Sequence, residues 1–281
     1  MGMKIAKITT QKNRQDRFNV FKVESGKEEY AFSVDENVLV QWQLRKDMTL
    51  TEENIEMIQT EDQKRKVWND ALHYLTHAMR TEYQVVQYLK KKEYEQAPIE
   101  ETIGKLKEYR LLQDEEYAMA FVRTKMNTSD KGPAVISEDL YQKGVSKDLS
   151  EKALQQYTYE AQLETAQLFF QKKGKPKNNE SASSMKTRLI NALRRKGFSM
   201  EVAFEAWENE QVEMPEEEEK KAVFTQGEKA RKKWGKKYTG SSLKMKIKEH
   251  LYRKGFDLSH IEHYLQYEME VSEEDNNEEK I

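Results

Sequence analysis

Side chains that could carry out catalysis are few and poorly grouped in this 281-residue chain. His73 and His77 would share one helical face, as would His260 and His263, but no third ligand accompanies either pair. The chain has no cysteine, which excludes disulfides and thiol chemistry. It also has no Gly-rich phosphate loop and no Gly-x-Ser-x-Gly elbow. We therefore expect no enzyme activity, no cofactor and no metal.

The charged side chains are segregated along the chain, although the net charge is only -2. Residues 171–210 carry nine basic and five acidic side chains (+4), and residues 220–260 carry thirteen and three (+10). Residues 211–219 carry -5 and residues 261–281 carry -7. A basic block of this size favours a phosphate backbone or an acidic protein surface as partner, although a solvated helix face has a similar composition.

One basic run also contains aromatic rings. Arg231-Lys-Lys-Trp234-Gly-Lys-Lys-Tyr238 could stack on bases and pair with phosphates. Downstream, Leu243, Ile247 and Leu251 would form an apolar helical stripe with cations on both sides, so the helix can pack and still present positive charge. The candidate contacts to DNA or to a protein partner are Arg80, Arg123, Lys131, Arg194, Arg195, Lys196, Arg231, Lys232, Lys233, Lys244, Lys246, Lys248, Arg253 and Lys254.

The elements that must position these side chains begin with a region rich in β-forming residues. Polar turns at Gln11–Arg17 and Ser25–Lys27 separate three such runs, which predicts a small antiparallel sheet. The runs are Lys4–Thr10, Phe18–Val23 and Tyr30–Val34. After them, Asp35 can cap a short helix through Leu44, and Thr51 can open another helix.

The rest of the chain is expected to be helical. Its 37% hydrophobic and 35% charged residues, with only 4 prolines and 11 glycines, indicate exposed helical faces and few turns. The predicted fold is therefore mostly α, with tandem three-helix repeats after a small N-terminal antiparallel β segment. We divide the chain into that segment (1–60), four repeats (61–112, 113–159, 160–212 and 213–270) and an acidic flexible tail (271–281). The first repeat is expected to contain helices near 62–78, 80–92 and 98–110.

The same helix ending occurs three times. Leu-Tyr-Gln-Lys-Gly-Val, Leu-Arg-Arg-Lys-Gly-Phe and Leu-Tyr-Arg-Lys-Gly-Phe begin at residues 140, 193 and 251. Each predicts a Schellman stop, in which Gly144, Gly197 or Gly255 is left-handed and the leucine contacts the apolar residue after the glycine. A Ser or Asp two residues after each glycine can cap the next helix. In the first repeat, Glu93 stands where this glycine would be.

Three further stretches accompany these endings: Tyr74-Leu75 with Met79-Arg80-Thr81-Glu82-Tyr83, Leu111–Ala118 with Phe121-Val122-Arg123, and Lys131-Gly132-Pro133 with Ile136, Leu140 and Lys143-Gly144-Val145. Together they resemble the signature of the RecX family of regulators of the RecA recombinase. The resemblance covers residues 68–155 most closely, and the later repeats continue the pattern more loosely.

The resemblance implies a protein without catalytic activity, built as an elongated, curved array of three-helix repeats. Family members bind the RecA filament on single-stranded DNA, lie in its groove, and inhibit its ATP hydrolysis and strand exchange or favour its disassembly. Many also bind single-stranded or double-stranded DNA. A cytoplasmic monomer that acts in DNA repair, recombination and the SOS response is expected. No stretch approaches the roughly 18 apolar residues of a membrane span, so no membrane partner is expected.

Two alternatives from other classes stay open. The chain could be a helical protein that binds naked DNA without a recombinase, with the repeated endings as helix-turn-helix elements. The helices that would then read bases, 147–157, 200–210 and 258–268, are poor in cations, which argues against major-groove recognition. A structural scaffold without a nucleic-acid role would bind neither partner.

Overall fold

The computed structural model describes residues 2–12 and 15–267, and contacts divide it into two units. Residues up to 120 form the first unit together with 140–150, and residues 121–139 form the second with the chain from 151 onward. The predicted acidic tail lies outside the described residues. No helix in the described ranges is both long and apolar enough to cross a membrane.

The first unit opens with the predicted antiparallel sheet, which is confirmed. Strands β1 (Met3–Thr10), β2 (Arg17–Glu24) and β3 (Lys27–Asp35) pair in sequence, and a short β4 (Thr49–Leu50) adds to the other side of β1. The order is β3-β2-β1-β4. Strand β4 was not predicted, because a two-residue strand has no alternating pattern.

Two helices follow the sheet, and both caps were predicted. Asp35 accepts the Asn37 N–H at 2.9 Å and begins α1 (Glu36–Gln41). Thr51 forms a reciprocal capping box with Asn54 and begins α2 (Glu52–Thr76). A separate helix beginning near residue 62 was wrong, because no Gly or Pro interrupts the sequence between 51 and 76 and α2 runs through without a break.

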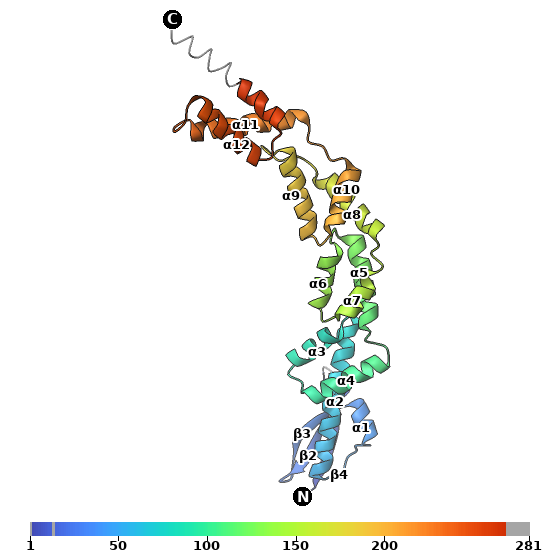
Figure 1. Cartoon of the computed structure of the whole chain (residues 1–281). Helices are drawn as coiled ribbons and strands as arrows, with labels where there is room; N and C mark the ends of the chain where they lie inside the picture. The colour runs from blue at the N-terminus through green and yellow to red at the C-terminus, as the bar shows by residue number, and fades with distance from the viewer. Residues whose placement is uncertain (1, 13–14, 268–281) are drawn as a thin grey trace. The chain divides into compact units, whose positions relative to one another are not determined.

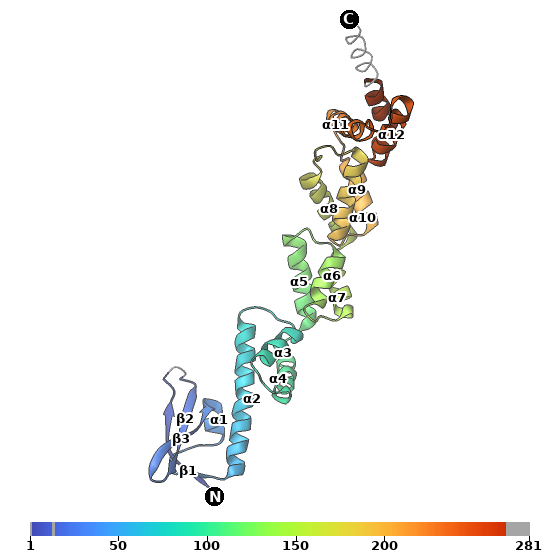
Figure 2. The ribbon, with the colours of Figure 1, turned by 90° about the vertical axis from the view of Figure 1, so that its left-hand side faces the viewer.

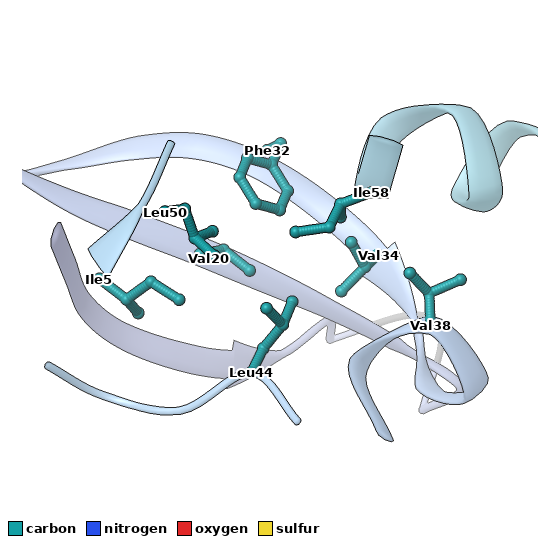
Figure 3. Packing of buried hydrophobic residues seen from close by; sticks show 8 residues of the cluster. All are labelled: Ile5, Val20, Phe32, Val34, Val38, Leu44, Leu50 and Ile58. Atoms are coloured by element: carbon teal, nitrogen blue, oxygen red, sulfur yellow. The ribbon is translucent and has the colours of Figure 1, made fainter. Parts of the chain in front are cut away.

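The sheet and the first half of α2 enclose an apolar core. Figure 3 shows side chains from β1, β2, β3 and β4, from α1 and from the segment after α1 packed together with Ile58 of α2. The cluster consists of Ile5, Val20, Phe32, Val34, Val38, Leu44, Leu50 and Ile58, all buried. Burial of these side chains holds α2 against the sheet.

The second half of α2 is the first helix of the first repeat. In Figure 2, α2 continues past the sheet and meets α3 (Glu82–Lys91) and α4 (Gln96–Glu108). Their shared core includes Val67, Val85, Leu89 and Ile99. Because α2 serves both the sheet and the repeat, the N-terminal segment and the first repeat share one helix, and the division at residue 60 stays a prediction.

The remaining helices follow the predicted order of three-helix repeats. The second group is α5 (Asp114–Thr128), α6 (Pro133–Tyr141) and α7 (Lys147–Leu154); the third is α8 (Tyr159–Lys173), α9 (Ala182–Arg195) and α10 (Met200–Glu210); the fourth is α11 (Glu216–Trp234), α12 (Gly240–Arg253) and a helix over residues 258–267. The mostly α class and the three-helix repeats are confirmed.

Within the second unit, α8 and α10 lie side by side (Figure 1), and Phe170 meets Trp207 edge to face at 5.6 Å between centroids. The last group has its own core, which includes Val223, Ile247 and Leu251. The predicted stripe on α12 is therefore its packing face, and Ile247 and Leu251 are fully buried.

Candidate contact surfaces of the helical repeats

The three repeated endings are Schellman stops, as predicted. Gly144, Gly197 and Gly255 have φ of +81°, +94° and +83°. After each glycine, the next N–H donates to the carbonyl of the leucine five residues earlier, at 3.1, 3.2 and 3.3 Å. Such a stop satisfies carbonyls that the helix leaves without partners and fixes where the chain turns.

The first repeat keeps this geometry with a glutamate. Glu93 has φ of +63°, and Tyr94 donates to the Leu89 carbonyl at 3.4 Å. A side chain in this region costs roughly 1 to 2 kcal/mol. Glu93 is exposed, so local space does not oppose its side chain.

Each glycine turn also receives the start of the middle helix of the preceding repeat. We call this contact a repeat joint. The Thr81 hydroxyl, which caps α3, donates to the Lys143 carbonyl at 2.6 Å. The Ser181 hydroxyl, which caps α9, donates to the Lys254 carbonyl at 2.7 Å. At the joint before α6, the Gly132 N–H donates to the Lys196 carbonyl at 2.7 Å.

The glycines are needed for these joints as well as for the stops. A Cβ at Gly144 would overlap the side chain of Tyr83, and one at Gly197 would lie 2.5 Å from the Val135 nitrogen. At Gly255, a Cβ would lie 3.0 Å from the Ser181 oxygen. The sequence predicted the left-handed turn but not the neighbouring repeat against it.

The first free N–H of two middle helices is satisfied by a carboxylate from the next repeat. Asp114 accepts the Glu82 N–H at 2.8 Å, and Glu219 accepts the Ala182 N–H at 3.1 Å. Asp114 thus caps the helix of the repeat before its own, and burial raises the pKa of its carboxyl. At the corresponding place α6 begins with Pro133, which has no N–H to satisfy.

Two middle helices are braced by an ion pair that spans eight residues. Lys131 pairs with Asp139 at 2.5 Å. At α9 the acidic residue comes first: the Glu180 carboxylate, just before the helix, accepts two hydrogen bonds from Arg188 within it, at 2.7 and 2.8 Å. Lys131, a predicted contact residue, therefore has a structural partner.

Arg80 occupies the corresponding position before α3, and its partners are aromatic rings. Its guanidinium lies 4.7 Å from the centroid of Tyr74, which stacks on Tyr88 at 4.1 Å. Cation–π stacking holds the side chain in place and is worth about 0.5 to 2 kcal/mol. Arg80 is half-buried, so the structure places it in the framework of the first repeat.

Four other candidate cations have acidic partners. Lys196 pairs with Asp130 at 2.7 Å, and its ammonium lies 5.6 Å from the Phe169 ring. The other three pairs are Arg231 with Glu228 at 3.2 Å, Lys246 with Glu249 at 2.9 Å, and Lys248 with Glu262 at 3.2 Å. These pairs are at least partly exposed, so each contributes about 1 kcal/mol or less and can exchange partners.

The remaining candidates have no ion pair among the described residues. They are Arg123, Arg194, Arg195, Lys232, Lys233, Lys244, Arg253 and Lys254. Arg194 and Arg195 lie in the last turn of α9, and Arg253 lies in that of α12, directly before the glycine turns. A cation there interacts favourably with the helix dipole, and these side chains are also exposed enough to meet a partner.

Other exposed residues that were not predicted as contacts occupy these same positions. Lys90 and Lys91 on α3 correspond to Arg194 and Arg195, counted from the buried leucine of each ending. At the first of these positions α6 and α12 carry tyrosines, Tyr141 and Tyr252, whose exposed fractions are 72% and 64%. Counting from the repeated leucine would have found both tyrosines.

The last repeat gathers aromatic and basic groups at one place. A shallow hollow is lined by Trp234 of α11 and by Lys246, Glu249, Tyr252 and Arg253 of α12. Burial lowers the pKa of His250, and the positive charges of Lys254, Arg253 and Lys233 lower it further. Three of the cations from the basic segment 220–260 therefore lie near His250 in the folded repeat.

The histidine pairs gain no further ligands. His73 and His77 meet edge to face, with ring centroids 4.9 Å apart. Within the ranges that the structure describes, no three His, Cys, Asp or Glu side chains are placed to hold a metal ion.

Four segments of the chain match descriptions of one family. "Regulatory protein RecX N-terminal domain" matches residues 3–51, and the first, second and third "three-helix domain" of RecX match 68–106, 114–154 and 216–265. Residues 155–215, between the last two matches, contain α8, α9 and α10. The third three-helix description therefore falls on the fourth group of helices.

Relatives and solved structures extend this likeness over most of the chain. Regulatory protein RecX of Halalkalibacterium halodurans is 41% identical over 93% of this chain and 98% of its own. The protein of that name from Bacillus pumilus is 42% identical, over 93% and 97%. A crystal structure of regulatory protein RecX aligns with a TM-score of 0.61 and 36% identity, covering 75% of this chain and 100% of that one. RecX from Lactobacillus salivarius aligns with a TM-score of 0.52 and 33% identity, over 54% and 99%. The chain belongs to the RecX family of regulatory proteins.

Proposed function

We propose that this protein is a non-enzymatic regulator of homologous recombination and DNA repair. It binds the RecA filament on single-stranded DNA, in the filament groove, and lowers its ATP hydrolysis and strand exchange or promotes its disassembly. Membership of the RecX family supports this role. Repeated joints with exposed cations beside them suit a partner that is itself long and periodic.

One observation carries the proposal furthest: exposed cations with no ion pair among the described residues lie next to the glycine turns of α9 and α12. Arg194 and Arg195 lie at one turn, and Arg253 and Lys254 lie at the other. Because the repeat joints hold both turns against a neighbouring helix, the cations are presented from fixed backbone. Fixed placement lowers the entropy lost when phosphates or acidic side chains bind.

The test uses RecA, single-stranded DNA and ATP, with the protein added at increasing concentration. The unaltered protein should lower ATP hydrolysis, and Arg194→Glu with Arg195→Glu should require at least about tenfold more protein, since a tenfold change corresponds to about 1.4 kcal/mol. Lys172→Glu with Lys173→Glu is the control, because these exposed cations end α8, which forms no repeat joint of this kind. Equal loss in both variants would reject the assignment to the joint, and no effect of the unaltered protein would reject the regulatory role.

Binding of naked DNA by helix-turn-helix reading is the second candidate. The third helix of the third group, α10, carries four glutamates and no cation. Such a helix would be repelled by the phosphates that flank the major groove. The structure therefore favours contacts through the middle helices.

A further inference from the structure

We propose that the last repeat binds a single strand of nucleic acid directly, with bases stacked on Tyr252 and Trp234 and phosphates paired with the surrounding cations. We call the end of α11, the turn after it, and α12 the α11–α12 surface. The proposal deepens the proposed function and depends on it for the presence of single-stranded DNA. It assigns this surface to the strand itself, whereas the recombinase could be contacted elsewhere.

The charge of the α11–α12 surface fits a polyanion. Nine cations lie between residues 231 and 254: Arg231, Lys232, Lys233, Lys236, Lys237, Lys244, Lys246, Lys248 and Arg253, followed by Lys254 at the turn. Over the same range the sole acidic residue is Glu249, which pairs with Lys246. An acidic protein surface could also be attracted here, so charge alone does not select the partner.

The aromatic side chains select nucleic acid over protein. Tyr252 is 64% exposed and lines the same hollow as Trp234 and Arg253. Trp234 meets Tyr238 edge to face at 6.1 Å, and the Lys233 ammonium lies 4.8 Å from the Trp234 ring. Tyr252 is thus exposed and Trp234, which packs against the core of the repeat, is partly exposed. Accessible aromatic rings between cations are the arrangement that binds unpaired bases regardless of sequence.

Tyr252 lies outside the apolar core of its own repeat. The core of this repeat is completed by Ile247, Leu251, Phe256 and Tyr264, and Tyr252 is not part of it. The Nε1 of Trp234 is enclosed and has no hydrogen-bond partner among the described residues. A strand in the hollow would cover the exposed tyrosine ring.

The second repeat provides an internal comparison. Tyr141 occupies the same position in its ending as Tyr252 and is 72% exposed. Its neighbour is Gln142, where the last repeat has Arg253. An exposed tyrosine at this position is therefore present in both repeats, but the flanking cation is present only in the last.

The experiment measures binding of the full chain to two labelled probes of equal length, oligo(dT) and an abasic strand with the same phosphates. The unaltered protein should bind oligo(dT) more tightly. Tyr252→Ala should weaken oligo(dT) binding by about tenfold, since stacking is worth roughly 1 to 3 kcal/mol per base, and should leave binding of the abasic strand nearly unchanged. Tyr252→Phe keeps the ring and should bind normally, and Tyr141→Ala should also bind normally.

Equal affinity for both probes, or equal effects of Tyr252→Ala and Tyr141→Ala, would overturn the proposal. Circular dichroism would establish that each variant is folded. Because inhibition of recombinase ATP hydrolysis is measured separately, the outcomes are distinguishable. Normal inhibition with no base preference rejects stacking alone, whereas base preference without inhibition rejects the regulatory role alone.

Discussion

At the scale of single residues, the buried ion pair of the N-terminal segment shows what sequence patterns miss. Arg17 stood at the end of a predicted polar turn, yet it is only 4% exposed and donates to both oxygens of Asp62, at 3.2 and 2.9 Å. Asp62 also accepts the Asp35 N–H at 2.7 Å. The partners are 45 residues apart, and no local periodicity connects them.

We predict that Asp62→Asn destabilises the protein by about 3 to 5 kcal/mol, because it leaves a buried guanidinium without its counter-charge. Urea unfolding followed by circular dichroism measures the change. Replacing both partners with apolar residues, Arg17→Met with Asp62→Leu, should recover part of the loss. A loss below about 1 kcal/mol for Asp62→Asn would show that water or another group satisfies Arg17.

At the scale of elements, the repeat joint explains why the endings are so alike. Position 197 requires glycine for two reasons: its φ is +94°, and the backbone of Val135 approaches too closely for a side chain. Glu93 needs only the first property, and there the chain tolerates a side chain. Periodicity and capping rules predicted the stops, since those depend on a few consecutive residues. They could not predict the joints, which unite segments 62 or more residues apart.

Substitutions at Gly197 and at Glu93 should shift the midpoint of thermal unfolding in opposite directions. Gly197→Ala should lower the midpoint of thermal unfolding, because it adds left-handed strain and a clash with backbone that cannot move away. Glu93→Gly should raise the midpoint slightly, by relieving about 1 kcal/mol of strain. Gly104, which is helical and has open space around its Cα, provides the control Gly104→Ala, expected to be neutral or stabilising. A neutral Gly197→Ala would contradict the joint.

At the scale of the whole molecule, the proposed function depends on how exposed cations are distributed. Of the predicted contact residues, Lys131 and Arg80 support the fold, whereas Arg194, Arg195, Arg253 and Lys254 remain free to meet a partner. Sequence composition located the basic half of the chain. Composition could not distinguish cations with structural partners from cations that stay available, because that difference depends on which carboxylates and rings the fold brings close to each cation.

This distribution has a measurable consequence in salt. Each phosphate contact to a single strand contributes about 0.7 to the slope of log affinity against log salt concentration. Arg253→Gln with Lys254→Gln should therefore reduce the slope for oligo(dT) by about 1.4. Lys131→Gln should leave the slope unchanged, since Lys131 is paired with Asp139. An unchanged slope in the double variant would place the strand elsewhere.

The repeat joint also bears on how such a chain can lengthen. The beginning of a middle helix donates to the glycine turn of the next repeat, and its own glycine turn accepts a donor from the preceding repeat. In α9, Ser181 donates to Lys254, and the turn at Gly197 accepts the Gly132 N–H through the Lys196 carbonyl. A gene segment duplicated in frame would therefore carry both complementary halves of the contact and need no newly evolved interface. Duplication of a three-helix group would therefore be enough to lengthen the chain. Glu93 lies in the first group, whose turn receives no preceding group.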